Sequence, residues 1–245
     1  MIRYGISVDV KNVPVLDPEF TPLLKFNNAF LKNAAKPVSL AVERADGQMA
    51  VYHTKIHGTP EMAEADTYYI DRIVKTMLWL KGGFRIFVND KSIYDYLCGV
   101  YCKGGAREFD WDFMANIFEH PFEVIYTDNV PEEKDAPISM GGHLDGCRIG
   151  FDAGGSDRKV SAVIDGETVF SEEVVWYPKV TEDPQYHYDG IVSAFKAAAA
   201  HMPRVDAVGI SSAGIFNMSF NNISLITNFP HTIHLLLYQS HHISY

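Results

Sequence analysis

The spacing of hydrophobic residues along the first half of the chain changes several times, and each change predicts a new strand or helix. Strand-like patterns at residues 37–43 and 49–53 flank Asp46-Gly47, which predicts a β-hairpin. A helix should follow, with Thr59 as N-cap, Pro60 at its first position and Gly82 after its end. Its predicted core face consists of Met62, Tyr69, Ile70, Ile73, Met77 and Leu80. Residues 84–88 and 122–126 are expected to be strands, and residues 92–101 a helix.

The second half repeats this order of elements. A short apolar run at residues 149–151 leads into a turn and a second apolar run, and Asp165-Gly166 predicts the next hairpin. Asp183 is the expected N-cap of a helix that Pro203 ends, and residues 205–210 should form a buried strand. Two hairpin–helix–strand units at nearly equal spacing indicate either related half-domains or the ordinary reuse of this order in α/β proteins.

Composition changes divide the chain into three segments. Residues 128–137 contain two prolines and many acidic side chains, as a linker does, so the expected domains are 1–145 and 146–216. Residues 217–245 contain no Asp, Glu, Lys, Arg, Gly, Ala or Val. A frameshift or a recombined end explains this aberrant tail better than a function does. Its four histidines, at 231, 234, 241 and 242, lack an acidic or thiolate partner for a metal site.

Charge and cysteine content narrow the class of protein. The formal net charge is −10, and no dense basic run is present, which argues against a nucleic-acid partner. The first residues lack a signal-peptide pattern, and no apolar stretch is long enough to predict a membrane span. Three cysteines are too few for a disulfide framework, so a cytoplasmic protein is expected. Self-association into a homo-oligomer stays open.

The chemistry concentrates in residues 152–156, which read Asp-Ala-Gly-Gly-Ser between two strands. Gly154 and Gly155 would let backbone N–H groups approach phosphate oxygens, and the Ser156 hydroxyl would add a donor. Asp152 could hold magnesium directly or through water, and Lys159 or Arg158 could offset further negative charge. The plainer interpretation is an ordinary hairpin whose aspartate caps its own turn.

A second candidate group follows the buried strand at residues 205–210. Ser211, Ser212 and Gly214 come after its end, where open α/β sheets place ligand sites, so they are candidate substrate contacts. The alternative is that they form a connecting turn without a ligand.

The run at residues 152–156 and the small-residue turn at 211–214 together resemble the ROK family of sugar kinases and sugar-responsive regulators, within the actin-like ATPase superfamily. The family's opening motif is close to Asp-x-Gly-Gly-Thr, which Asp152, Gly154, Gly155 and Ser156 match with serine in place of threonine. The resemblance covers residues 147–216. It implies an α/β, ribonuclease H-like half-domain that binds ATP and magnesium, with a nucleotide and a sugar as partners.

The resemblance is incomplete where catalysis is concerned. In the family the catalytic base is an aspartate after an asparagine, and a Glu-x-Gly-His motif contacts the sugar; neither follows Gly214. The single Asn-Asp pair of the chain, Asn89-Asp90, lies in the first segment. The expected function is therefore an incomplete, truncated sugar kinase that is inactive alone. The alternatives are a non-catalytic actin-like module that senses a nucleotide or sugar, and a dehydratase-activating ATPase, whose cluster-binding cysteines this half lacks.

Overall fold

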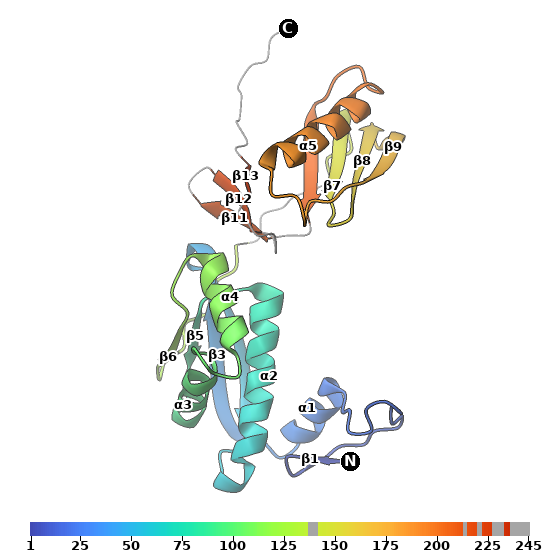
Figure 1. Cartoon of the computed structure of the whole chain (residues 1–245). Helices are drawn as coiled ribbons and strands as arrows, with labels where there is room; N and C mark the ends of the chain where they lie inside the picture. The colour runs from blue at the N-terminus through green and yellow to red at the C-terminus, as the bar shows by residue number, and fades with distance from the viewer. Residues whose placement is uncertain (137–141, 213–214, 220–221, 227–232, 236–245) are drawn as a thin grey trace. The chain divides into compact units, whose positions relative to one another are not determined.

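The chain folds into two compact α/β units, residues 1–138 and 139–245 (Figure 1). The structure is a computed structural model that describes residues 1–136 and 142–212, and the backbone of 215–219, 222–226 and 233–235. The α/β class predicted from the sequence is confirmed. Among the described residues, none of the helices combines the length and apolar character that a bilayer crossing requires.

The first unit is built on a four-stranded sheet with the order β4-β3-β5-β6. The predicted hairpin pairs β3 with β4 antiparallel, β5 joins the other edge of β3 antiparallel, and β6 lies parallel to β5. The strands and short elements of this unit are β1 (Ile2–Arg3), β2 (Ile6–Ser7), β3 (Lys36–Glu43), η1 (Ala45–Gly47), β4 (Met49–Ile56), η2 (Pro60–Met62), β5 (Arg85–Val88) and β6 (Glu123–Tyr126). Its α-helices are α1 (Leu23–Leu31), α2 (Ala63–Lys81), α3 (Lys91–Val100) and α4 (Glu108–Phe118).

Helix α2 supplies much of the core of the first unit. Tyr69 and Ile70 are fully buried, and the Tyr69 ring stacks on Phe30 of α1 at 4.3 Å between centroids. Burial raises the pKa of Tyr69 to about 12, although its hydroxyl hydrogen-bonds Thr54. Two details of the predicted helix are wrong. The α-helix starts at Ala63, after a 3-10 turn that the Thr59 side chain does not cap, and Leu80 is 77% exposed rather than part of the core.

Asp90 links β5 to the start of α3. Its side chain accepts the Ile93 N–H as a helix N-cap and also bonds Ser92 and the Lys36 ammonium, 2.6 Å away. Burial acts to raise the pKa of Asp90, but these hydrogen bonds outweigh it and hold the pKa below its ordinary value of 3.8. The one Asn-Asp pair of the chain is thus a structural cap in this structure.

Replacing Asp90 with alanine should lower the stability of the first unit at pH 7 by about 1–2 kcal/mol, mainly through the lost cap. Because the folded pKa is depressed, the charged group stabilises the fold above pH 4 and loses this effect as the pH falls through the folded pKa. Urea denaturation at pH 7 and pH 3 should therefore show a smaller mutant–wild-type difference at pH 3. Asp90→Asn keeps a cap acceptor and should lose less; a difference that does not change with pH would contradict the assignment.

The second unit contains a four-stranded sheet with the order β10-β7-β8-β9 and one described helix, α5. Strands β7, β8 and β9 form an antiparallel meander, and β10 lies parallel to β7. The bounds are β7 (Cys147–Ala153), β8 (Asp157–Ile164), β9 (Glu167–Val175), α5 (Pro184–Ala199) and β10 (Ala207–Ser212). The predicted N-cap is confirmed, because the Asp183 carboxylate accepts the Gln185 N–H.

The two sheets share the hairpin–helix–strand order, but each contains one strand that has no counterpart in the other. In the first unit β5 pairs directly with β3, whereas in the second unit β7 lies between β8 and β10. The strand directions agree, since β10 runs antiparallel to β8 just as β5 runs antiparallel to β3. The first sheet thus lacks β7 and gains β6 at its edge, where no described strand of the second sheet corresponds, and the duplication stays a prediction.

The last part of the second unit includes a three-stranded antiparallel sheet, made of β11 (Ile215–Ser219), β12 (Asn222–Ile226) and β13 (Ile233–Leu235). The interpretation of this uncharged tail as aberrant is not tested, because its side chains lie outside the described residues. The same holds for the prediction on its four histidines.

Candidate functional site

The four-residue connection between paired Ala153 and Arg158 contains the candidate phosphate-binding residues. Its first three members, residues 154–156, are called the glycine turn here. Both outer carbonyls of the turn are held by one residue: the Trp176 indole N–H donates to the Gly154 carbonyl at 2.8 Å, and the Trp176 backbone N–H donates to the Ser156 carbonyl at 3.1 Å. Trp176 is itself buried. The carbonyls of the turn therefore point toward the protein and are fixed.

The backbone N–H groups of the turn, unlike its outer carbonyls, have no hydrogen-bond partner among the described residues. Within the described residues, the amides of Gly154, Gly155 and Ser156 have no hydrogen-bond acceptor. Consecutive unpaired amides in a tight connection form the kind of concavity that binds anionic oxygens. The turn therefore offers three backbone donors to a ligand.

Neither glycine has a positive φ, so close approach by other atoms, and not backbone conformation, limits what can replace them. A Cβ on Gly154 would lie 2.5 Å from the Asp157 carbonyl oxygen, which is backbone and cannot move aside. A Cβ on Gly155 would lie 2.4 Å from Cε of Lys179. Side chains at either position would thus fill space over the turn.

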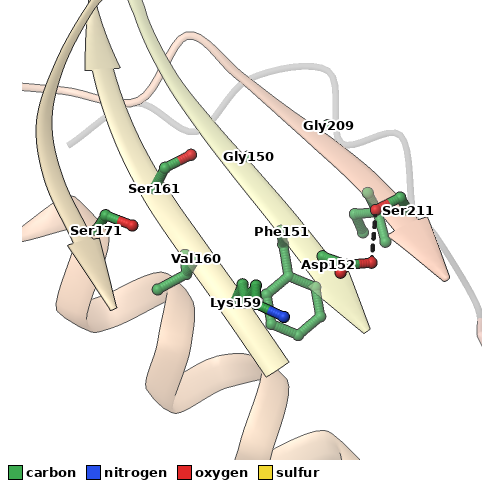
Figure 2. Close-up of a pocket in the computed structure, with 10 residues that line it drawn as sticks. Gly150, Phe151, Asp152, Lys159, Val160, Ser161, Ser171, Gly209 and Ser211 are labelled. Atoms are coloured by element: carbon green, nitrogen blue, oxygen red, sulfur yellow. Dashed lines mark hydrogen bonds between the residues drawn. The ribbon is translucent and has the colours of Figure 1, made fainter. Parts of the chain in front are cut away.

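Asp152 precedes the turn and projects from the face of the sheet opposite α5. Its neighbours Ile149 and Phe151 pack against α5, so alternation along β7 places Gly150 and Asp152 on the other face. Parallel pairing of β10 with β7 puts Ser211 directly beside Asp152, and the Ser211 hydroxyl donates to Asp152 Oδ1 at 2.8 Å (Figure 2).

An open cavity of about 520 Å³ covers this face of the sheet. Small and polar residues from all four strands form one side of it, as Figure 2 shows: Gly150, Asp152, Lys159, Ser161, Ser171, Gly209 and Ser211. Two cross-strand rows explain the shape. The row Gly209, Gly150, Ser161, Ser171 is nearly flat, and the row Ser211, Asp152, Lys159 borders it with polar groups.

Lys159 lies next to Asp152 across the β7–β8 pair, but its ammonium is already engaged. Its Nζ is 2.8 Å from Asp157 Oδ1 and 3.9 Å from Glu173 Oε2. The hydrogen bond to Asp157 raises the pKa of Lys159, which stays charged and locally compensated. Arg158 is on the α5 side, where its guanidinium lies over the Trp176 ring and donates to Ser193.

The structure brings most of the predicted site residues to one end of the second sheet. Asp152, Lys159 and Ser211 share the open face, the glycine turn follows Asp152 by two residues, and Ser212 donates to the Ala153 carbonyl at 3.3 Å. Gly214 lies outside the described residues.

Two residues near the turn, Trp176 and Lys179, escape the sequence reasoning. The hairpin register pairs Asp157 with Val175, which places Trp176 beside the glycine turn. A bulge between Ala162 and Val163 shifts this register by one residue, so counting back from the Asp165-Gly166 turn would give the wrong partners.

Magnesium fits the donor set at this end of the sheet. The ion prefers oxygen ligands and commonly uses one or two carboxylates together with substrate phosphates. Asp152 supplies a carboxylate with one oxygen bonded to Ser211, and the turn supplies donors for the phosphates themselves. In the parts of the chain that the structure describes, no three His, Cys, Asp or Glu side chains gather as a metal cage.

Comparisons with known proteins give only distant similarity. No protein-family model matches the sequence, and no curated protein matches it. An exopolyphosphatase from Cytophaga hutchinsonii is 11% identical, with a TM-score of 0.21 over 72% of this chain and 64% of that one. The Ppx/GppA phosphatase of Aquifex aeolicus is 11% identical, with a TM-score of 0.20 over 71% and 63%. This chain thus spans less than two thirds of either structure, and its fold class follows from its own sheet topology.

Proposed function

We propose that the second unit binds the phosphate groups of a nucleotide, with magnesium, at the glycine turn and Asp152. The observation that carries the proposal is that, within the described residues, the outer carbonyls of the turn are hydrogen-bonded to the protein and its N–H groups are not. Trp176 holds its two outer carbonyls, while the three N–H groups of residues 154–156 have no acceptor among the described residues.

Asp152 would hold the metal beside these donors. Bound magnesium would neutralise phosphate charge, and Ser211 would orient the carboxylate by its hydrogen bond to Oδ1. The motif at residues 152–156 resembles that of ROK sugar kinases, which supports ATP as the nucleotide and a sugar as the second ligand. Ser211 and Ser212 are then the proposed sugar contacts, on the strand next to Asp152.

The proposal is for binding and sensing rather than for turnover. The described residues supply a phosphate turn and a metal carboxylate, while Asp90, from the one Asn-Asp pair, is buried as a helix cap in the first unit. A module that changes its binding state with a nucleotide needs no general base. A relationship to sugar kinases is compatible with the role of a sensor, because both need residues that bind the nucleotide.

Calorimetric titration with Mg-ATP tests the proposal. Wild-type protein should bind, and Asp152→Ala should bind about tenfold more weakly, since it removes a metal ligand. In EDTA the two proteins should differ little, because Asp152 acts through the metal. Glu172→Gln makes the same change in charge at an exposed site of β9 outside the cavity and should bind like wild type. Equal affinities of wild type and Asp152→Ala in magnesium would refute the metal role.

A further inference from the structure

Lys179 lies against the glycine turn, although it is far from it in sequence. A Cβ built on Gly155 would be 2.4 Å from Lys179 Cε and 2.8 Å from its Nζ. The ammonium group is therefore in contact with the space just over the turn. Lys179 is exposed, so solvent and ligands can reach it.

The charge of Lys179 has no internal partner in the described residues, because no carboxylate lies within ion-pair distance of it. This separates Lys179 from the two cations expected from the sequence. Lys159 is paired with Asp157 and Glu173, and Arg158 is bound to Ser193 on the α5 side of the sheet. Of the three, Lys179 is the one whose charge is available to an anion at the turn.

The segment that carries Lys179 is held in place on both sides. Before it, Trp176 is tied to the glycine turn, and the Tyr177 N–H donates to the Tyr186 hydroxyl of α5 at 3.0 Å. Around it, the Thr181 hydroxyl donates to the Tyr177 carbonyl at 2.8 Å, and a ring nitrogen of buried His187 lies 3.2 Å from the Pro178 carbonyl. These contacts anchor the backbone of Lys179 to α5 and to the turn, which reduces the ordering that binding would require.

We propose that Lys179 is the cation of the anion site at the glycine turn and binds phosphoryl oxygens together with the turn amides. The inference rests on the proposed function and specifies which side chain carries the positive charge there. Lysine suits this role as a compact point charge on a flexible stem. The ligand class is a di- or triphosphate, either as part of a nucleotide or as free pyrophosphate.

The closing experiment compares Lys179→Met with Lys196→Met, which removes the same charge from an exposed site on α5 outside the cavity. Titrations with Mg-ATP, magnesium pyrophosphate and AMP are run on both variants and on wild type. Lys179→Met should bind ATP and pyrophosphate about tenfold more weakly. Lys196→Met should stay within about twofold of wild type. If Lys179→Met loses similar affinity for ATP and for pyrophosphate, the site recognises the phosphate groups without the nucleoside. If wild type binds ATP but not pyrophosphate, the ligand is a nucleotide.

A second variant displaces the Lys179 amine without removing its charge. Gly155→Ala adds a Cβ that collides only with the far end of the Lys179 side chain, so the fold should tolerate it while the amine is displaced. It should weaken ATP binding in wild type but add little to Lys179→Met. An unchanged affinity in Lys179→Met, with wild type binding normally, would overturn this inference and leave the proposed function standing. A wild-type protein that binds neither ATP nor pyrophosphate would overturn the proposed function and the inference together.

Discussion

Replacing Asp71 with alanine should destabilise the first unit by about 3 kcal/mol, because it leaves a largely buried guanidinium without its main partner. Asp71 of α2 accepts two hydrogen bonds from Arg107, which precedes α4; one joins Nε to Oδ1 at 2.9 Å, and the other joins Nη2 to Oδ2. Hydrogen bonding to Asp71 is the main reason that the pKa of Arg107 is raised above its ordinary value. Arg107 thus stays charged at any pH at which the protein folds, and cannot escape the penalty by losing its proton.

The neighbouring contacts set the size of this effect. Asp110, almost fully buried, accepts from Lys75 and from the Trp79 indole, and lies 3.8 Å from Arg107. It offers Arg107 a partial substitute, which is why the lower end of the range for a broken buried pair is expected. Asp95→Ala is the matched control, because its pair with Lys91 is exposed and should contribute less than about 0.5 kcal/mol.

The measurement is urea denaturation followed by tryptophan fluorescence. Trp176 is in the second unit, so a Trp176→Phe background leaves Trp79 and Trp111 to report on the first unit alone. Asp71→Leu combined with Arg107→Met should recover much of the loss, since an apolar pair of similar volume avoids the cost of desolvating charge. A loss below about 1 kcal/mol in Asp71→Ala would show that water solvates Arg107 in the folded state.

Local signals in the sequence account for the elements that it predicted well. Asp46-Gly47 and Asp165-Gly166 are turn dipeptides, and both aspartates adopt a positive φ in the structure, as tight hairpins require. Asp183 is an N-cap in the structure because its carboxylate can reach the Gln185 amide, which depends on adjacent residues only. Such features need no tertiary information.

The misses depend on packing. Leu80 fits the apolar period of α2 but faces solvent, although Met77 and Leu78 of the same turn are buried. The helix at Glu108–Phe118 was not predicted, since its aromatic residues cover most of its circumference and weaken the period. What fixes it is the contact of Asp110 and Arg107 with α2, a tertiary interaction.

The candidate site divides in the same way. The proximity of Asp152 and Ser211 could be predicted, because the ends of parallel strands meet at one edge of a sheet. The engagement of Lys159 could not, since it depends on Glu173 of β9 and on the conformation of Asp157. Trp176 and Lys179 reach the glycine turn through the β8–β9 register and the anchoring of their loop on α5, neither of which is visible in a short motif.

A coupled ADP-release assay across hexoses and amino sugars should detect no sugar kinase activity from this chain. Phosphoryl transfer to a hydroxyl needs a base beside that hydroxyl, and loss of one typically costs a factor of about 10²–10⁴ in rate. On the described open face, Asp152 is bonded to Ser211, and Asp157 and Glu173 are engaged with Lys159. Asp206 precedes β10 and so lies at the end of that strand away from Ser211.

The pKa directions support the same expectation. The hydrogen bond from Arg204 lowers the pKa of Asp206, and the bonds from Lys36, Ser92 and Ile93 lower that of Asp90 in spite of its burial. A general base works best with a pKa near the working pH, and both shifts move away from it. Binding with positioning but without a base gives a nucleotide-binding protein that does not turn over sugar. Turnover at ordinary kinase rates that disappears in Asp152→Ala would contradict this, and would mean that the base lies outside the described open face.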